Sequence, residues 1–98
     1  MTTLAVYWRT GAKVAYLTEY LKYEEIRVGL GDDFELCVEA VLDGISSHPR
    51  LCRVISRNVK RRIVRRFPYL IYYVVKRRSI EVIGFRHARM RPKKRFPK

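Results

Sequence analysis

The 98 residues include only two cysteines, five glycines and four prolines. So few glycines and prolines exclude a collagen-like or low-complexity chain, and two cysteines are too few for the disulfide framework of a small secreted domain. The longest apolar run lies around Leu70–Val75 and is far shorter than the about 20 residues that a membrane-spanning helix needs. Residues 1–9 are too few and too polar for a secretory signal. We therefore expect a cytoplasmic protein with free thiols.

A metal or cofactor motif is also missing. Cys37, His48 and Cys52 are separated by ten and then three residues, spacings that fit no familiar zinc pattern, and a fourth ligand is lacking. We expect no metal and no cofactor, and no internal repeat is visible.

Negative charge is nearly absent from the second half. Residues 1–49 hold four basic and eight acidic side chains, whereas residues 50–98 hold 18 basic ones and a single acid, Glu81. A need for solubility alone would not sort charges in this way. The second half is therefore predicted to bind an anionic partner, which could be nucleic acid, a membrane surface or an acidic protein segment. With 48% hydrophobic residues, we expect one domain over residues 1–92 and a basic, mobile tail at 93–98.

The first half has the pattern of a strand followed by two helices. Residues 2–8 are rich in β-branched and aromatic side chains and predict a strand. From Ala12 the pattern is helical: Val14, Leu17 and Leu21 recur on one face, which a helical hairpin must bury, with three tyrosines beside it. The segment from Gly29 to Gly31 ends this helix, and the acids that follow favour the start of a second one. Its apolar stripe is Phe34, Val38, Val41, Leu42 and Ile45.

The second half changes to strand periodicity. We predict strands over Val59–Phe67, Tyr69–Lys76 and Ile80–His87. In the last of these, strict alternation places Phe85 with Glu81 and Ile83, opposite Ile80 and Val82. The order β-α-α-β-β-β predicts an α+β fold of two layers, in which an N-terminal strand and a helical hairpin are followed by a three-stranded antiparallel meander.

Four segments, in this order and spacing, resemble the RelE/ParE superfamily of toxins, and most closely its ParE-like, or plasmid-stabilisation, branch. They are Gly-Leu-Gly-Asp-Asp-Phe from Gly29, Ser-His-Pro from Ser47, Arg-Arg-Phe-Pro-Tyr-Leu-Ile-Tyr-Tyr from Arg65 and His-Ala-Arg-Met-Arg-Pro from His87. The resemblance covers about residues 14–92, and its implied fold agrees with the pattern above.

The resemblance implies the toxin component of a bacterial type II toxin–antitoxin system, a cytoplasmic growth inhibitor neutralised by a cognate acidic antitoxin. ParE-like members act by binding a target such as DNA gyrase. RelE-like members are instead endoribonucleases that cut mRNA on the ribosome. The alternatives are thus a RelE-type nuclease or a plain nucleic-acid-binding domain. No membrane partner is implied.

The RelE-type catalytic set is incomplete in this sequence. Its central-strand arginine falls at Leu70, and leucine cannot contact a phosphate. Arg89 matches the arginine after the last strand, Arg61 could stand for a basic strand residue, and residues 90–98 contain no tyrosine. Because positioned groups act as a set, we favour a non-enzymatic toxin. The weak catalytic candidates are Arg61, His87 and Arg89.

Two basic groups are the candidate binding sites. The target-binding candidates are Arg86, His87, Arg89 and Arg91, and the antitoxin-binding candidates are Arg61, Arg62, Arg65 and Arg66. If the strand that carries the second group lies at an edge of the sheet, an acidic antitoxin segment could bind there by strand addition. Nearby tyrosines at 69, 72 and 73 could stack on bases, but we favour a place in the core.

Overall fold

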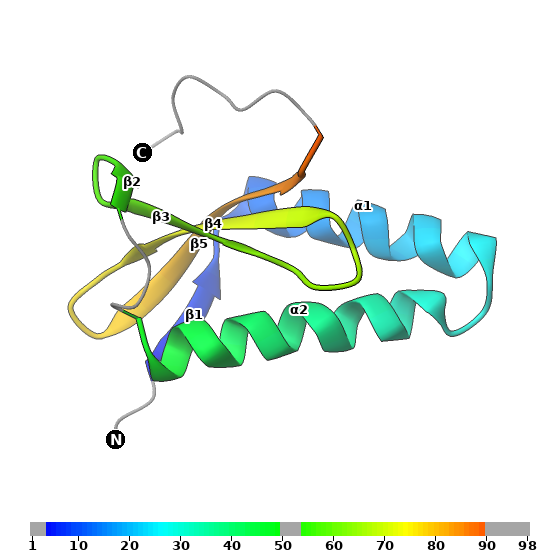
Figure 1. The fold of residues 1–98 in the computed structure, drawn as a ribbon, viewed down its shortest axis with the longest axis horizontal. Coiled ribbons are helices and arrows are strands. Elements are labelled where there is room, and N and C mark those ends of the chain that lie inside the picture. The colour runs from blue at the N-terminus through cyan, green and yellow to red at the C-terminus, as the bar shows by residue number, and fades with distance from the viewer. Residues whose placement is uncertain (1–3, 50–53, 90–98) are drawn as a thin grey trace.

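The molecule consists of a helical hairpin packed on a sheet (Figure 1). The computed structural model describes residues 4–49 and 54–89, so the predicted tail at 93–98 lies outside the described residues. In chain order the elements are β1 (Ala5–Trp8), α1 (Thr10–Ile26), α2 (Leu30–Ser47), β2 (Val54–Ser56), β3 (Val59–Ile63), β4 (Tyr69–Val75) and β5 (Ser79–His87). The predicted two-layer α+β fold is confirmed.

The strands form one sheet in the order β1-β5-β4-β3-β2. β3, β4 and β5 form the expected antiparallel meander, and β1 pairs parallel to β5. β2 adds a strand that the sequence pattern does not predict. It pairs with β3 at Val59 and Lys60, after a turn in which Arg57 and Asn58 both have positive φ, as a tight two-residue hairpin requires. β3 is therefore not the outermost strand of the described sheet.

The sheet has a helix side, which the hairpin covers, and a far side. Side chains of β4 alternate between the two sides. The core on the helix side contains Tyr69, Ile71 and Tyr73 of β4 with Phe34, Val38, Leu42 and Ile45 of α2. The far side carries a smaller cluster of Val59, Leu70, Tyr72, Val74 and Ile83. The stripe predicted for the second helix thus forms its buried face.

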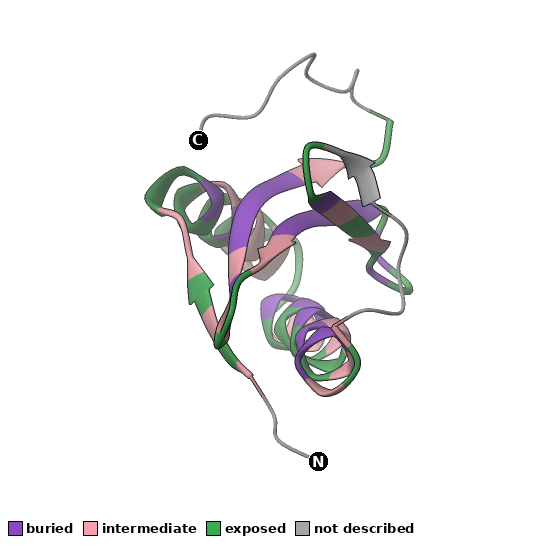
Figure 2. Ribbon diagram, turned by 90° about the vertical axis from the view of Figure 1, so that its left-hand side faces the viewer, coloured by how far each residue is buried: buried purple, intermediate pink, exposed green. Residues whose placement is uncertain are grey.

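The face predicted for the first helix is wrong. Val14, Leu17 and Leu21 of α1 are 58%, 45% and 59% exposed, whereas Tyr16 is buried. Figure 2 shows the outer surface of both helices as exposed. The tyrosine face is buried because its rings reach the aromatic core: the Tyr16 and Phe34 ring centroids lie 5.7 Å apart. An aromatic ring buries more apolar area than an aliphatic side chain and gains from ring–ring contacts.

A bulge in β5 corrects one side-chain placement. Phe85 lies on the helix side with Val82, whereas Ile83 lies on the far side. The register between β4 and β5 shifts between Tyr72 and Tyr73. β5 therefore accommodates one extra residue there, and the alternation of its side chains reverses beyond that point.

The strand predicted to reach Phe67 ends at Ile63, and residues 64–68 form a loop. Arg66 in this loop has a φ of 73°, a left-handed conformation that interrupts an extended strand. Phe67 is buried and packs edge-on against Phe34 at a centroid distance of 5.1 Å. The loop is thereby fixed against the hairpin with its arginines at the surface.

Candidate functional site

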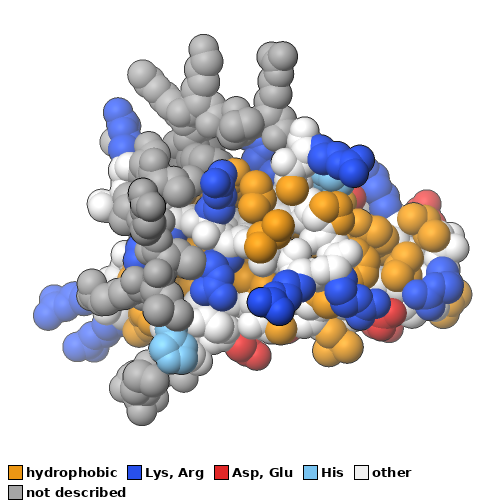
Figure 3. All heavy atoms as spheres, in the orientation of Figure 1, with side chains coloured by type: hydrophobic (Ala, Val, Ile, Leu, Met, Phe, Trp, Pro, Cys, Tyr) orange, Lys and Arg blue, Asp and Glu red, His pale blue; other side chains and the backbone are white. Residues whose placement is uncertain are grey.

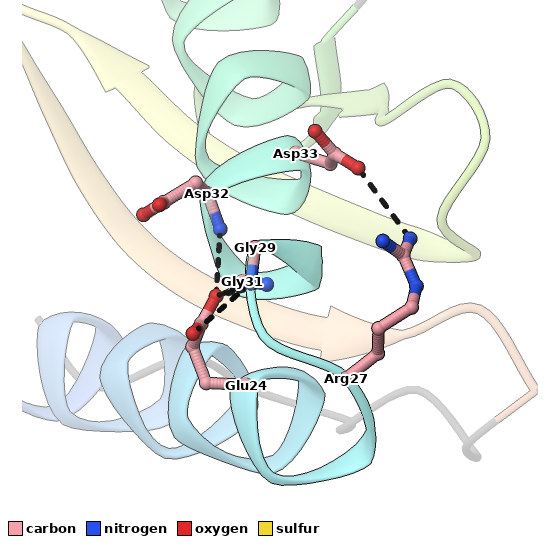
Figure 4. Close-up of polar contacts among 6 residues, drawn as sticks. All are labelled: Glu24, Arg27, Gly29, Gly31, Asp32 and Asp33. Carbon is pink, nitrogen blue, oxygen red and sulfur yellow. Dashed lines mark hydrogen bonds and ion pairs between the residues drawn. The ribbon is translucent and has the colours of Figure 1, made fainter.

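The Gly-Leu-Gly turn is positioned by one carboxylate of α1 (Figure 4). Glu24 accepts hydrogen bonds from the backbone N–H groups of Gly29 at 3.0 Å, Gly31 at 2.8 Å and Asp32 at 3.3 Å. Helix N-termini leave such groups without intrahelical partners, so Glu24 caps α2 from the neighbouring helix. Gly29 has a φ of 91°, and a Cβ on Gly31 would lie 2.5 Å from the Cγ of Glu24. Both glycines are therefore required by geometry.

Two further contacts connect the helices at this end. The hydroxyl of Tyr20 donates to the carboxylate of Asp32 at 2.7 Å, and this hydrogen bond raises the pKa of Tyr20 to about 12 because it stabilises the neutral phenol. The guanidinium of Arg27 lies 3.7 Å from a carboxylate oxygen of Asp33 (Figure 4). This second pair is exposed and contributes little on its own. The motif that carries the resemblance thus holds the hairpin closed.

The fold separates the two signs of charge. Residues 10–47, which contain the hairpin, hold three basic and eight acidic side chains, whereas residues 54–89 hold eleven basic side chains and one acid. Arg61, Arg62, Arg65 and Arg66 form no ion pair with a described residue. Figure 3 shows Lys and Arg side chains gathered on the face that carries β3, with hydrophobic side chains among them. The acids of the first half therefore do not neutralise these arginines.

The antitoxin-binding candidates on β3 point to opposite sides of the sheet. Arg61 pairs with Tyr72 and therefore lies on the far side. The guanidinium of Arg62 lies on the helix side, 3.7 Å from the position of a Cβ on Gly44 of α2. The loop after β3 carries Arg65 and Arg66, both exposed, and the guanidinium of Arg66 lies 5.7 Å from the Phe67 ring centroid. Because β2 covers part of β3, these arginines offer side chains rather than a fully open strand edge.

The target-binding candidates are also divided by the sheet. Arg86 pairs with Leu70 on the far side, whereas His87 pairs with Tyr69 on the helix side. The rings of Tyr69 and His87 are 5.2 Å apart. The backbone N–H of Arg89, which is exposed, donates to Nδ1 of His87 at 3.0 Å. Arg91 lies outside the described residues.

The weak catalytic candidates are divided between the two sides of the sheet. Arg61 lies on the far side and His87 on the helix side, where the backbone N–H of Arg89 donates to His87. Leu70 packs in the apolar cluster of the far side. Each of the three tyrosines of β4 is at most 4% exposed, so none offers an open ring face for a base. Burial raises the pKa of Tyr69, and the hydrogen bond that its hydroxyl donates to Glu19 at 2.7 Å raises it further.

Glu81 is the single acid of the second half, and it connects β5 to the residues that directly follow β1 and β4. Its Oε1 lies 3.3 Å from the Arg9 guanidinium and 3.2 Å from the Lys76 ammonium. Hydrogen bonding to Arg9 and Lys76 holds the pKa of Glu81 below its usual value. Sequence reasoning missed this role and that of Glu24. For Glu24, the available signal was an acid five residues before a glycine-rich turn.

The described ranges contain neither a metal cluster nor a membrane helix. In residues 4–49 and 54–89, no three His, Cys, Asp or Glu side chains lie close enough together to hold a metal ion. No helix in these ranges is both long and apolar enough to cross a bilayer. Cys37 is half-buried and free, and Cys52 lies outside the described residues.

Comparison with known proteins gives a match in structure and none in sequence. No family model matches the chain, and no curated protein matches it. The fold is similar to that of a chain in the solved structure of the chromosomal ParDE TA system from P. aeruginosa, with a TM-score of 0.72 over 87% of this chain and 96% of that chain. The chain therefore shares the fold of a chain of that system. At 12% sequence identity, the likeness is one of fold.

Proposed function

We propose that the chain is the toxin of a type II toxin–antitoxin pair and that an acidic antitoxin neutralises it. The single observation that supports this most is the RelE/ParE-like fold, which it shares with a chain of a ParDE TA system. The sorting of charge agrees with it, because eleven basic side chains against one acid over residues 54–89 suit a partner rich in carboxylates.

We further propose that the toxin acts by binding a macromolecule and not by cutting RNA. Cleavage of a phosphodiester needs groups that activate the 2′-hydroxyl, hold the phosphate and protonate the leaving oxygen at one place. Here Arg61 and His87 lie on opposite sides of the sheet, and Leu70 stands in an apolar cluster. DNA gyrase is the candidate target that the ParE-like resemblance implies, and Arg86 and Arg89 are candidate contacts. The place in the cell that the proposal requires is the cytoplasm.

The decisive experiment is induction of the chain in bacteria with and without the small open reading frame beside its gene. We expect growth arrest without that partner, growth with it, and co-purification of the two proteins. Arrest with DNA breaks and an SOS response would support gyrase as the target, whereas new mRNA ends inside translated frames would contradict the binding mechanism. Normal growth on induction, with no co-purification, would overturn the toxin assignment itself.

A plain nucleic-acid-binding domain makes a different prediction. It would bind bare DNA or RNA with an affinity that falls steeply as salt rises, because each phosphate contact releases counterions. We expect only weak binding of this kind, and a tight, salt-steep complex in the absence of any toxicity would favour that alternative.

A further inference from the structure

The outer surface of α1 carries an aliphatic stripe that the fold leaves exposed. Val14, Leu17 and Leu21 are each at least 45% exposed, and their spacing of three and four residues places them on one face of the helix. A helix in a monomer normally turns such a stripe toward the core. In this hairpin the tyrosine face occupies the core instead, so the stripe remains available to a partner.

A row of carboxylates on α2 lies on the side of Tyr16 and Tyr20, which neighbour Leu17 and Leu21 on α1. Asp32, Glu35, Glu39 and Asp43 are all exposed and follow one another at three, four and four residues. Tyr20 of α1 donates to Asp32. Burial raises the pKa of Tyr16, and Glu35 and Glu39 lie near enough to raise it further. The carboxylates therefore border the side of α1 that faces α2. We call the stripe together with this row the hairpin face.

The complement to the hairpin face is present on the same chain. On β3 and its loop, Ile63 is 58% exposed and lies between Arg61 and Arg65 in the sequence, with Arg66 next. None of these three arginines forms an ion pair with a described residue. We call Arg61, Ile63, Arg65 and Arg66 the β3 patch. It offers an apolar side chain flanked along the chain by cations, where the hairpin face offers apolar side chains and anions.

We propose that the hairpin face of one copy binds the β3 patch of a second copy. The two surfaces differ, so the contact is head-to-tail and leaves one hairpin face and one β3 patch free at the ends of every open assembly. Growth therefore continues beyond two copies unless a ring closes. The inference goes beyond the proposed function and stands without it. If an antitoxin covers the β3 patch as proposed above, it also dissolves these assemblies.

The formal net charge of +13 opposes association only at low salt. The described fold measures 39 × 34 × 21 Å, several times the about 8 Å over which charges act at physiological ionic strength. Charges on distant parts of two copies are therefore screened, and the charges at the contact decide the result. There the carboxylates of one copy meet the arginines of the other.

Two charge-reversal variants test the contact. E35K/E39K removes the acidic side of the hairpin face, and R61E/R65E removes the basic side of the β3 patch. We expect the wild-type average mass, measured by sedimentation and light scattering near physiological salt, to rise with protein concentration beyond that of two copies. Each variant alone should have an association constant at least about tenfold below that of the wild type, because each contact loses two charge pairs. It should therefore stay monomeric at concentrations at which the wild type assembles.

Mixing the two variants gives the sharper test. The intact β3 patch of E35K/E39K can bind the intact hairpin face of R61E/R65E, and the two reversed surfaces are again opposite in charge, so an equimolar mixture should recover a complex of the two variants although neither assembles alone. This complex would also show that both variants are folded. The matched control is R77E/R78E, the same charge change at the turn between β4 and β5, which should associate like the wild type.

Several outcomes would overturn the proposal. A wild-type chain that stays monomeric up to millimolar concentration would exclude the second copy as the occupant of the stripe. Association that survives in either variant alone, or a mixture that forms no complex although circular dichroism shows both variants folded, would exclude this pair of surfaces. A loss of association in R77E/R78E equal to that in R61E/R65E would mean that only total charge matters. None of these measurements involves the antitoxin, so they fail or succeed separately from the proposed function.

Discussion

Replacing Glu24 by glutamine tests the inter-helix cap that holds the hairpin closed. The carboxylate of Glu24 accepts from three backbone N–H groups at the start of α2, the shortest at 2.8 Å. Glutamine keeps one acceptor oxygen but loses the negative charge, and its amide presents N–H groups toward N–H groups. The substitution therefore removes both part of the hydrogen bonding and the favourable interaction with the helix N-terminus.

The expected cost follows from the number of contacts. A hydrogen bond to a charged group contributes about 1.5–3 kcal/mol in general, and partial exposure lowers that value. Since one acceptor remains, we expect Glu24→Gln to lower the free energy of unfolding by about 1–2 kcal/mol and Glu24→Ala by about 2–3 kcal/mol. In a domain of this size, each kcal/mol corresponds to a decrease in Tm of about 4–8 °C.

The assay is thermal and urea unfolding followed by circular dichroism. Glu25→Gln is the matched control, because it makes the same charge change one residue away at an exposed side chain. It should lower the free energy of unfolding by less than about 0.5 kcal/mol. The reasoning would be refuted if both variants lost the same stability, since the loss would then reflect net charge and not the cap.

Further substitutions test other contacts by the same unfolding measurements. Gly31→Ala should destabilise strongly because its Cβ would lie 2.5 Å from Glu24 Cγ, whereas Gly11→Ala, with nothing within 4 Å, should be neutral or stabilising; equal effects would contradict this. Glu81→Gln should cost most near neutral pH. Because the pKa of Glu81 is lowered from 4.5 in the fold, its contribution is present above about pH 4.5 and is lost as pH falls through the folded pKa, so a stability difference that persists unchanged at pH 2 would exclude the ion pairs as its source. Tyr69→Phe should cost about 1 kcal/mol through its bond to Glu19, while Tyr7→Phe, at a 62% exposed ring, should cost nothing measurable. Leu17→Ser should lower the free energy of unfolding by less than about 0.5 kcal/mol and Val38→Ala by about 2 kcal/mol or more. The reverse order would mean that the aliphatic face of α1 packs in the core after all.

The sequence predicted the fold because its main signals are local. The apolar stripe of α2 and the strand of Tyr69–Val75 need no distant partner to be recognised. The buried face of α1 was misjudged because two faces compete for the core, and the choice depends on rings such as Phe34 that lie on another element. The bulge in β5 and the added strand β2 are likewise set by pairing between strands, which a single sequence does not reveal.

The candidate site was predicted less well, for a related reason. Charge counting finds the basic half of the molecule but not which side of the sheet each arginine faces. Arg86 and His87 are neighbours in sequence and lie on opposite sides of β5. The same holds for Arg61 and Arg62 on β3. A run of cationic residues in a strand therefore contributes to two separate surfaces, and the positive charge on each is less dense than the sequence implies.

The central claim is that the basic sheet, and not bulk positive charge, binds an acidic antitoxin. The most direct measurement compares the affinity of the purified antitoxin for the wild-type chain, for R65E/R66E and for K94E/R95E, which makes the same change of charge in the basic tail. We predict at least a tenfold loss for R65E/R66E, or about 1.4 kcal/mol, and a much smaller loss for K94E/R95E. Equal losses in the two variants would contradict the claim.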